Sequence, residues 1–240
     1  MNTPWRTRRR SGLRGVLPIV TILLAGLLGA CSANELAPGA ALQPRGDTGL
    51  AVLSLTRSGW RDFDLFVDLK GPGQWAPRPI ILRAKSFARD WKGGPEWKTT
   101  SVEDPEGRLV VLQLKPGTYR IDRWNGDSQR DGFNGNGYLM YPASPLDMTF
   151  DVKPGELTYL GELHFALPDK PNWLANLSTA TYRIEIKDQH ERDLALLRNK
   201  YPHENVGTPR TDLIRFAQAG APLRYYIQNY TDTDPIYPTP

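Results

Sequence analysis

Residues 62–69 read Asp-Phe-Asp-Leu-Phe-Val-Asp-Leu, and this stretch decides the fold class. Every second residue is apolar, and three of the positions between them are aspartates. Successive side chains of a β-strand point to opposite faces, so this period of two predicts a strand with one buried face and one solvated face. The solvated face carries Asp62, Asp64 and Asp68. Three such carboxylates can chelate a cation, but more often they keep one side of a sheet soluble.

Similar strand-like runs recur along the chain, at Leu50 to Leu55, Ile80 to Phe87, Leu109 to Leu114, Thr118 to Trp124, Met148 to Val152, Leu157 to Phe165 and Thr181 to Lys187. Two of the breaks between runs contain Lys-Pro-Gly, at residues 115–117 and 153–155. Proline presets the first central φ of a type II turn, and glycine supplies the positive φ of the second. About eight short strands without alternating helices predict a mainly β fold, an antiparallel two-sheet sandwich.

One or two short C-terminal helices are expected to follow the strands. Asp188 and Glu191 have the spacing of a capping box, and apolar residues then recur on one helical face up to Pro202. This pattern predicts a helix near 189–200. A second, shorter helix is predicted over 211–220, with a threonine as its N-cap and a glycine as its terminator.

The N-terminus has the pattern of an export signal. The first 14 residues carry five arginines and no acidic residue, and residues 15–30 carry no charge. This charged-then-apolar order is typical of a secretory signal, and the apolar part is shorter than the roughly 20 residues of a membrane-spanning helix. The alternative is an uncleaved N-terminal anchor.

Leu28-Gly29-Ala30-Cys31 closes this stretch, and Cys31 is the only cysteine in 240 residues. The four residues resemble the lipobox of bacterial lipoproteins. The resemblance implies cleavage before Cys31 and lipid on its sulfur and amino group, so that the partner is a membrane. Ser32, where lipoproteins retained in the inner membrane tend to have aspartate, resembles an outer-membrane sorting signal. We therefore expect a location in the cell envelope, at the periplasmic face of the outer membrane.

Four segments are expected from these patterns: a signal peptide over 1–30, a lipidated N-terminus with a flexible tether over 31–49, a sandwich with its C-terminal helices over 50–230, and a loosely ordered tail over 231–240. The tether is rich in Ala, Pro and Gly. A flexible chain of this length reaches roughly 20 to 25 Å, so the domain is expected to stand clear of the headgroups.

Charge excludes nucleic acid as an expected partner. The chain has 30 lysines and arginines against 26 aspartates and glutamates, but five of the arginines lie in the predicted signal. The mature chain then has 25 basic and 26 acidic side chains, so the excess of positive charge belongs to the segment that is removed. With its single cysteine acylated, the mature domain has no disulfide and depends on its core for stability.

The stretch from Leu109 to Tyr201 resembles bacterial lipoproteins of uncharacterised role. The resemblance rests on a strand, a Pro-Gly turn and a tyrosine-containing strand, followed by Phe150-Asp151-Val152-Lys153-Pro154-Gly155-Glu156 and Tyr159-Leu160-Gly161. More distantly, this part is similar to the transthyretin-like (carboxypeptidase-regulatory-like) sandwich modules. These resemblances imply a β-sandwich and a non-catalytic role.

No spacing in the sequence predicts catalysis, a metal or a cofactor. The three histidines, His164, His190 and His203, have no second His or Cys at a metal-ligand spacing. A Gly-x-Ser-x-Gly elbow and a phosphate-binding glycine loop are also absent from the sequence. His164 alternates with apolar neighbours on its strand and is expected to be exposed. A triad assembled from distant residues stays open, because such triads share geometry and not spacing.

Two aromatic stretches are candidate ligand sites. One contains Trp75, Trp91 and Trp97 in a segment rich in Gly, Pro and Lys. The other contains Trp124, Asp127, Asp131 and Tyr138 among glycines and asparagines. Aromatic faces with amides suit sugar rings, and oxygen ligands on a flexible backbone suit calcium. For both stretches the alternative is a long connection with partly buried aromatic residues.

We therefore expect a membrane-anchored cell-envelope lipoprotein that is not an enzyme and has a binding or structural β-sandwich domain. Its partner besides the membrane would be an envelope protein or a glycan. One alternative is a glycan-binding or peptidoglycan-binding module. Another is a hydrolase of unrecognised type, which a serine or aspartate within hydrogen-bond reach of a histidine would favour.

Overall fold

The computed structural model describes residues 35–59, 63–72, 78–82, 105–128, 137–167, 177–202 and 207–230. Within these ranges the chain is mainly β, with one α-helix, α2 (His190–Lys200). The strands are β1 (Gly49–Ser58), β2 (Asp64–Lys70), β3 (Arg78–Leu82), β4 (Glu106–Leu114), β5 (Gly117–Ser128), β6 (Gly137–Pro142), β7 (Met148–Val152), β8 (Leu157–Ala166), β9 (Leu177–Lys187), β10 (Arg210–Thr211) and β11 (Leu223–Tyr230).

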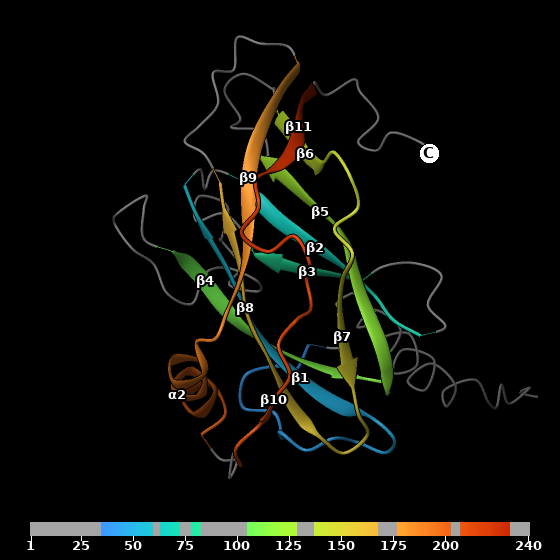
Figure 1. Ribbon diagram of the computed structural model, residues 1–240. Coiled ribbons are helices and arrows are strands. Elements are labelled where there is room, and N and C mark those ends of the chain that lie inside the picture. Colours follow the sequence, from blue (N-terminus) through green and yellow to red (C-terminus); the bar gives the residue numbers. More distant parts are fainter. Residues whose placement is uncertain are drawn as a thin grey trace, which may run out of the picture. The chain divides into compact units, whose positions relative to one another are not determined.

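Hydrogen bonds join these strands into one sheet. Its order is β3-β2-β5-β6-β11-β9-β8-β1-β4, with β7 beside β5 and β10 beside β8. The sheet curls into a nearly closed, barrel-like form (Figure 1). Most pairings are antiparallel, but β8 runs parallel to both β1 and β10. The predicted mainly β class is confirmed, whereas these parallel pairs depart from a purely antiparallel arrangement.

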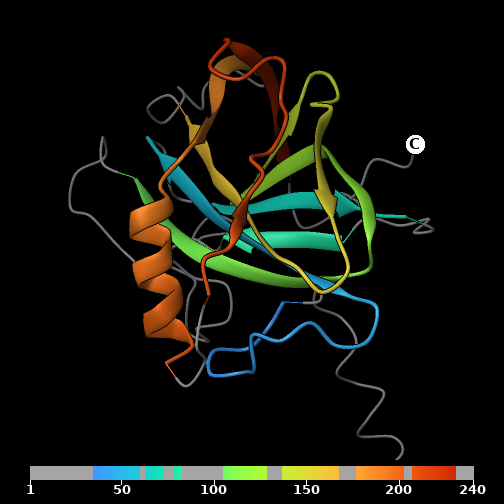
Figure 2. The same cartoon turned by 60° about the horizontal axis from the view of Figure 1, so that its bottom comes forward.

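Two apolar clusters hold the sheet and the helix together. The larger cluster fills the inside of the curled sheet and includes Leu53, Trp124 and Phe165. The smaller lies on the outer side of β1, β4 and β8, where α2 and the segment after residue 35 cover it (Figure 2). Because β1 contributes alternate residues to both clusters, nearly all of it is buried. A strand covered on both faces has a continuous apolar run.

The eight predicted strands correspond to β1, β2, β3, β4, β5, β7, β8 and β9, with shifted ends. Both Pro-Gly turns connect strands as expected, and Gly155 has the positive φ, +71°, that such a turn requires. The short strands β6, β10 and β11 were not predicted. Along β2 and the residue before it, Phe63, Leu65, Val67 and Leu69 are buried as expected. Asp64 is also fully buried and lies in register with Asp127 of β5. The prediction that this face of the strand is solvated is therefore wrong for Asp64. Asp62 lies outside the described residues.

The helix predicted near 189–200 is confirmed as α2. Its N-cap is Gln189 without a side-chain bond, and Asp188 accepts a hydrogen bond from the backbone N–H of His190 at 3.0 Å. The second helix, predicted over 211–220, is wrong. Ile214 donates its N–H to Leu160 O of β8, and Arg215 exchanges backbone hydrogen bonds with Thr149. Groups bonded to neighbouring strands cannot form the bonds of a helix.

The segment expected to be a flexible tether is docked from Glu35 onward. Glu35 pairs with Leu112 of β4 as an isolated bridge, and Leu42 is buried in the outer apolar cluster. The composition of this segment is typical of a flexible linker. It could not reveal the docking, because the residues that hold the segment lie some 70 positions away along the chain.

Candidate functional site

A glycine bulge in β8 sets the faces of the strand. Residues 52–54 of β1 lie opposite residues 159–162 of β8, so β8 contains one extra residue. Gly161 in this bulge has a φ of +92°. An extra residue shifts the alternation of side chains by one position. Glu162 therefore points to the outer face, as Tyr159 does, and both contact residues of α2.

Polar side chains of three elements meet on this outer face. We call them the outer polar cluster: Ser54, Thr56 and Ser58 of β1, Glu162 and His164 of β8, and Arg192 and Asp193 of α2. Ser58 and Arg192 are partly exposed, and the other five are buried. On each strand the polar residues of the cluster are two positions apart and so share one face. This spacing could have indicated a polar face, but the sequence did not show that the two strands and the helix lie together, because they are far apart in the chain.

A chain of hydrogen bonds runs through the strand half of the cluster. Thr56 donates its hydroxyl hydrogen to Glu162 Oε1 at 2.7 Å, so it accepts from His164 Nδ1 at 2.8 Å. This places the imidazole hydrogen on Nδ1 and leaves Nε2 as an acceptor. Nε2 lies 3.2 Å from the hydroxyl oxygen of Ser58. The hydroxyl of Ser58 therefore donates to a neutral imidazole.

The helix half of the cluster is centred on Asp193. Its Oδ2 accepts hydrogen bonds from Ser54 at 2.6 Å and from the Tyr159 hydroxyl at 2.9 Å. Its Oδ1 lies 2.7 Å from the guanidinium of Arg192. Arg192 also forms an ion pair with Glu162 Oε2 at 2.9 Å, which joins the two halves. The cluster thus fastens α2 to β1 and β8.

Burial controls the ionisation of two groups here. It lowers the pKa of His164, and the positive charge of Lys187 adds to this effect, while Glu162 opposes it. His164 is therefore neutral at neutral pH. Burial and the charge of Asp193 raise the pKa of Tyr159, so its hydroxyl remains a donor.

The expectation that His164 is exposed is wrong. The residue is only 4% exposed, and its strand β8 lies between β1 and β9. Its contact with Ser58 is a serine within hydrogen-bond reach of a histidine. The carboxylate, however, does not bond the imidazole directly: Glu162 Oε1 is 3.6 Å from Nδ1, and the Thr56 hydroxyl lies between them in the hydrogen-bond chain. Such an arrangement can orient the imidazole, and it can equally serve to lock two strands together.

The predicted ligand residues are not brought together where the structure describes them. Cys31, Trp75, Trp91, Trp97 and Asp131 lie outside the described residues. Trp124 is a core residue, 1% exposed, whose Nε1 donates to the hydroxyl of Tyr182 at 2.9 Å. Asp127, three residues later in β5, is partly exposed on the other face of the sheet. Tyr138 pairs through its backbone with Asn229 in the ladder between β6 and β11.

The indole of Trp124 is enclosed by other aromatic rings, with Phe165, Tyr182 and Tyr225 at centroid distances of 5.1 to 5.8 Å. A ring in this position has no face left for a ligand. An exposed aromatic pair does occur elsewhere: Tyr226 of β11 lies 5.5 Å from Tyr141 of β6 and is 37% exposed. These two tyrosines were not among the predicted ligand residues, because the strands β6 and β11 were not predicted.

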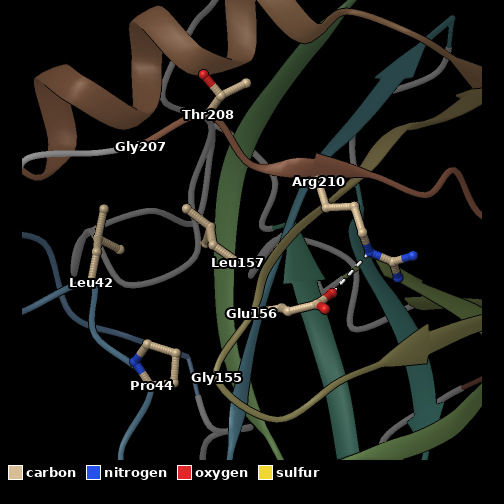
Figure 3. A pocket seen from close by; sticks show the side chains of 8 residues that line it. All are labelled: Leu42, Pro44, Gly155, Glu156, Leu157, Gly207, Thr208 and Arg210. Atoms are coloured by element: carbon tan, nitrogen blue, oxygen red, sulfur yellow. Dashed lines mark ion pairs between the residues drawn. The ribbon is translucent and has the colours of Figure 1, made fainter.

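A hollow of about 330 Å³ opens beside the docked N-terminal segment (Figure 3). Leu42 and Leu157 form part of its wall, and Glu156 and Arg210 form an ion pair of 2.9 Å across it. Arg210 also lies 2.9 Å from Asp212. Its positive charge is therefore already balanced by two carboxylates.

No three His, Cys, Asp or Glu side chains are grouped to hold a metal ion among the residues that the structure describes. In the same ranges of the chain, no helix has the length and apolar character needed to cross a bilayer.

The chain matches no family model, and no curated protein matches it. Among solved structures it is similar to a leucine-rich repeat protein from Bacteroides thetaiotaomicron, with 18% identity and a TM-score of 0.27. That match covers 57% of this chain and 13% of the other protein.

Proposed function

We propose that this chain is a lipoprotein of the cell envelope, anchored in a membrane by lipid on Cys31, and that its β domain binds or supports other envelope components without turning over a substrate. Leu28-Gly29-Ala30-Cys31, behind an uncharged stretch, has the residue types that acylation requires. Two or three acyl chains on one cysteine make attachment effectively permanent. The favoured membrane is the outer membrane, at its periplasmic face.

One structural observation carries this proposal. The strands, the helix and both apolar clusters that the structure describes are all built from residues after Cys31, from Glu35 onward. The expected mature chain, which starts at Cys31, therefore contains every element of the described fold.

The resemblance to transthyretin-like sandwich modules is part of the same proposal. Two groups of strands contribute to one apolar core, namely β1 with β4 and β8, and β2 with β3, β5, β6, β7 and β11. Strand β9 pairs with members of both groups. This arrangement supports a sandwich-like interpretation of the curled sheet.

Metabolic labelling with an alkyne-bearing fatty acid tests the anchoring. We expect label on the wild-type protein and its recovery in the detergent phase, because the acyl chains carry both properties. Cys31→Ser is the matched variant and should lose both. An unlabelled wild-type protein in the aqueous phase would contradict the proposal.

Hydrolysis is a second candidate function, and the 3.2 Å contact between Ser58 Oγ and His164 Nε2 favours it. A serine activated by a neutral imidazole reacts with acylating and phosphonylating reagents. The intervening hydroxyl of Thr56 favours the structural role instead.

A fluorophosphonate probe separates these two functions. A hydrolase would carry the probe on Ser58, and the label would be lost in Ser58→Ala and retained in Ser54→Ala, which alters the same face of β1. A structural cluster would give no adduct in any of the three proteins.

A further inference from the structure

The first described residues of the chain pair with one edge of the terminal strand β4. β4 is the last strand in the sheet order, and its outer edge receives the backbone of Leu36, whose N–H donates to Val111 O at 2.8 Å. The carboxylate of Glu35 forms an ion pair with the guanidinium of Arg108 on the same strand. The chain is therefore fixed to β4 from residue 35 onward.

The same segment is also fixed to the C-terminal end of α2. The Tyr201 hydroxyl donates to Leu36 O at 2.9 Å, and the N–H of Gly39 donates to Lys200 O at 3.0 Å. Leu36 and Leu42 pack in the outer apolar cluster, which includes Leu197 of the helix. Polar and apolar contacts thus hold residues 35–42 together.

Docking of this segment leaves a very short link to the lipid. Three residues separate Cys31 from Glu35, and a fully extended chain spans at most about 14 Å over these four steps. A free tether over residues 32–49 would reach roughly 20 to 25 Å on average and would not favour one face of the domain.

We propose that the bilayer surface is the partner of the outer face formed by the edge of β4 and the C-terminal end of α2, and that β6 and β11 point away from the membrane. This inference rests on the proposed acylation of Cys31. The exposed Arg198, in the last turn of α2, gives this face positive charge, while Lys200 beside it donates to Leu109 O of β4 at 2.6 Å. Basic residues near an anionic bilayer are attracted to its surface. α2 and β11 lie at different ends of the sheet in both views of the fold (Figures 1 and 2).

Site-specific labels on the full-length acylated protein test the orientation. Because the native cysteine is blocked by lipid, a cysteine introduced at Asn199 or Arg224 is the only free thiol, and both positions are exposed. Each fluorophore is compared in phosphatidylglycerol-containing vesicles with and without lipids that carry a headgroup spin label. We expect quenching at position 199 to be at least threefold stronger than at position 224.

A variant with 15 Gly and Ser residues inserted between Ser32 and Ala33 is the control. It keeps Cys31 and the docked segment, and we expect its quenching at positions 199 and 224 to become similar. Equal quenching with the natural link, or an unchanged difference with the long link, would overturn the inference. Failure of acylation is recognised separately on the protein without an introduced cysteine, because the thiol of Cys31 would then react with a maleimide polymer and shift the protein on a gel.

Discussion

Asp193 on helix α2 accepts a hydrogen bond of 2.6 Å from Ser54 on strand β1, although the two residues are 139 positions apart in the chain. The same carboxylate oxygen accepts from Tyr159 of β8. One buried side chain therefore connects the helix to two parallel strands, and its removal would leave two hydroxyls without their acceptor.

Asp193→Ala should destabilise the protein by at least about 2 kcal/mol, because each buried hydroxyl that loses its partner costs about 1–3 kcal/mol. Asp193→Asn keeps an acceptor oxygen and should cost less. Urea unfolding of the purified proteins measures both values. Glu191→Ala, an exposed change on the same helix, should stay within about 0.5 kcal/mol of the wild type. An Asp193→Ala protein as stable as this control would show that the contact contributes nothing.

Stability should fall as the pH drops below about 6.5, the usual pKa of histidine. Burial lowers the pKa of His164 in the folded state, so between the two pKa values the unfolded chain binds more protons. The contribution of His164 is therefore complete above the unfolded pKa and is lost toward the folded one. Urea unfolding at pH 7.5 and pH 5.0 measures this loss, which should be smaller in His164→Gln. An equal loss in both proteins would assign the pH dependence to other groups.

Gly161→Ala should destabilise the protein by about 1–3 kcal/mol, since a φ of +92° is strained for alanine. The added Cβ would also lie 3.0 Å from Lys187 O. Unfolding of Gly207→Ala provides the comparison, because a Cβ at that position meets nothing within 4 Å. If both variants unfold alike, neither the positive φ nor the close contact at Gly161 makes glycine necessary there.

Amide hydrogen exchange tests the docked N-terminal segment. The N–H of Leu36 should exchange slowly, and Arg108→Ala should accelerate its exchange roughly tenfold, as expected when a charged hydrogen bond of about 1.5 kcal/mol is lost. Arg45→Ala alters an exposed side chain of the same segment and should leave the rate unchanged. Fast exchange of the Leu36 N–H in the wild type would contradict the docking and favour a flexible tether instead.

Local patterns predicted the elements whose burial follows their own period. The alternate residues Phe63, Leu65, Val67 and Leu69 are buried on one side of the sheet, and α2 begins within a residue of its expected start. In both cases the periodicity of 2.0 or 3.6 residues is itself the consequence of one buried face.

Features that depend on distant partners were not predicted. The bulge at Gly161 reverses the alternation of β8, and the outer polar cluster forms only because β1 and β8 pair in parallel some 106 residues apart. Residues 211–220 have a helical pattern, but backbone groups in this segment form hydrogen bonds with β7 and β8 instead of with one another. Glu35 and Leu36 were assigned to a linker, because the sequence alone could not show that they pair with residues of β4, which lie far along the chain.

Mass spectrometry of the N-terminal peptide from membranes of the native host tests the central claim most directly. We expect a mature chain that begins at Cys31 and carries a diacylglyceryl group on sulfur, with or without a further acyl chain on the amino group. A peptide that retains residues 1–30, together with an unmodified thiol at Cys31, would contradict the anchoring and the membrane-facing orientation derived from it.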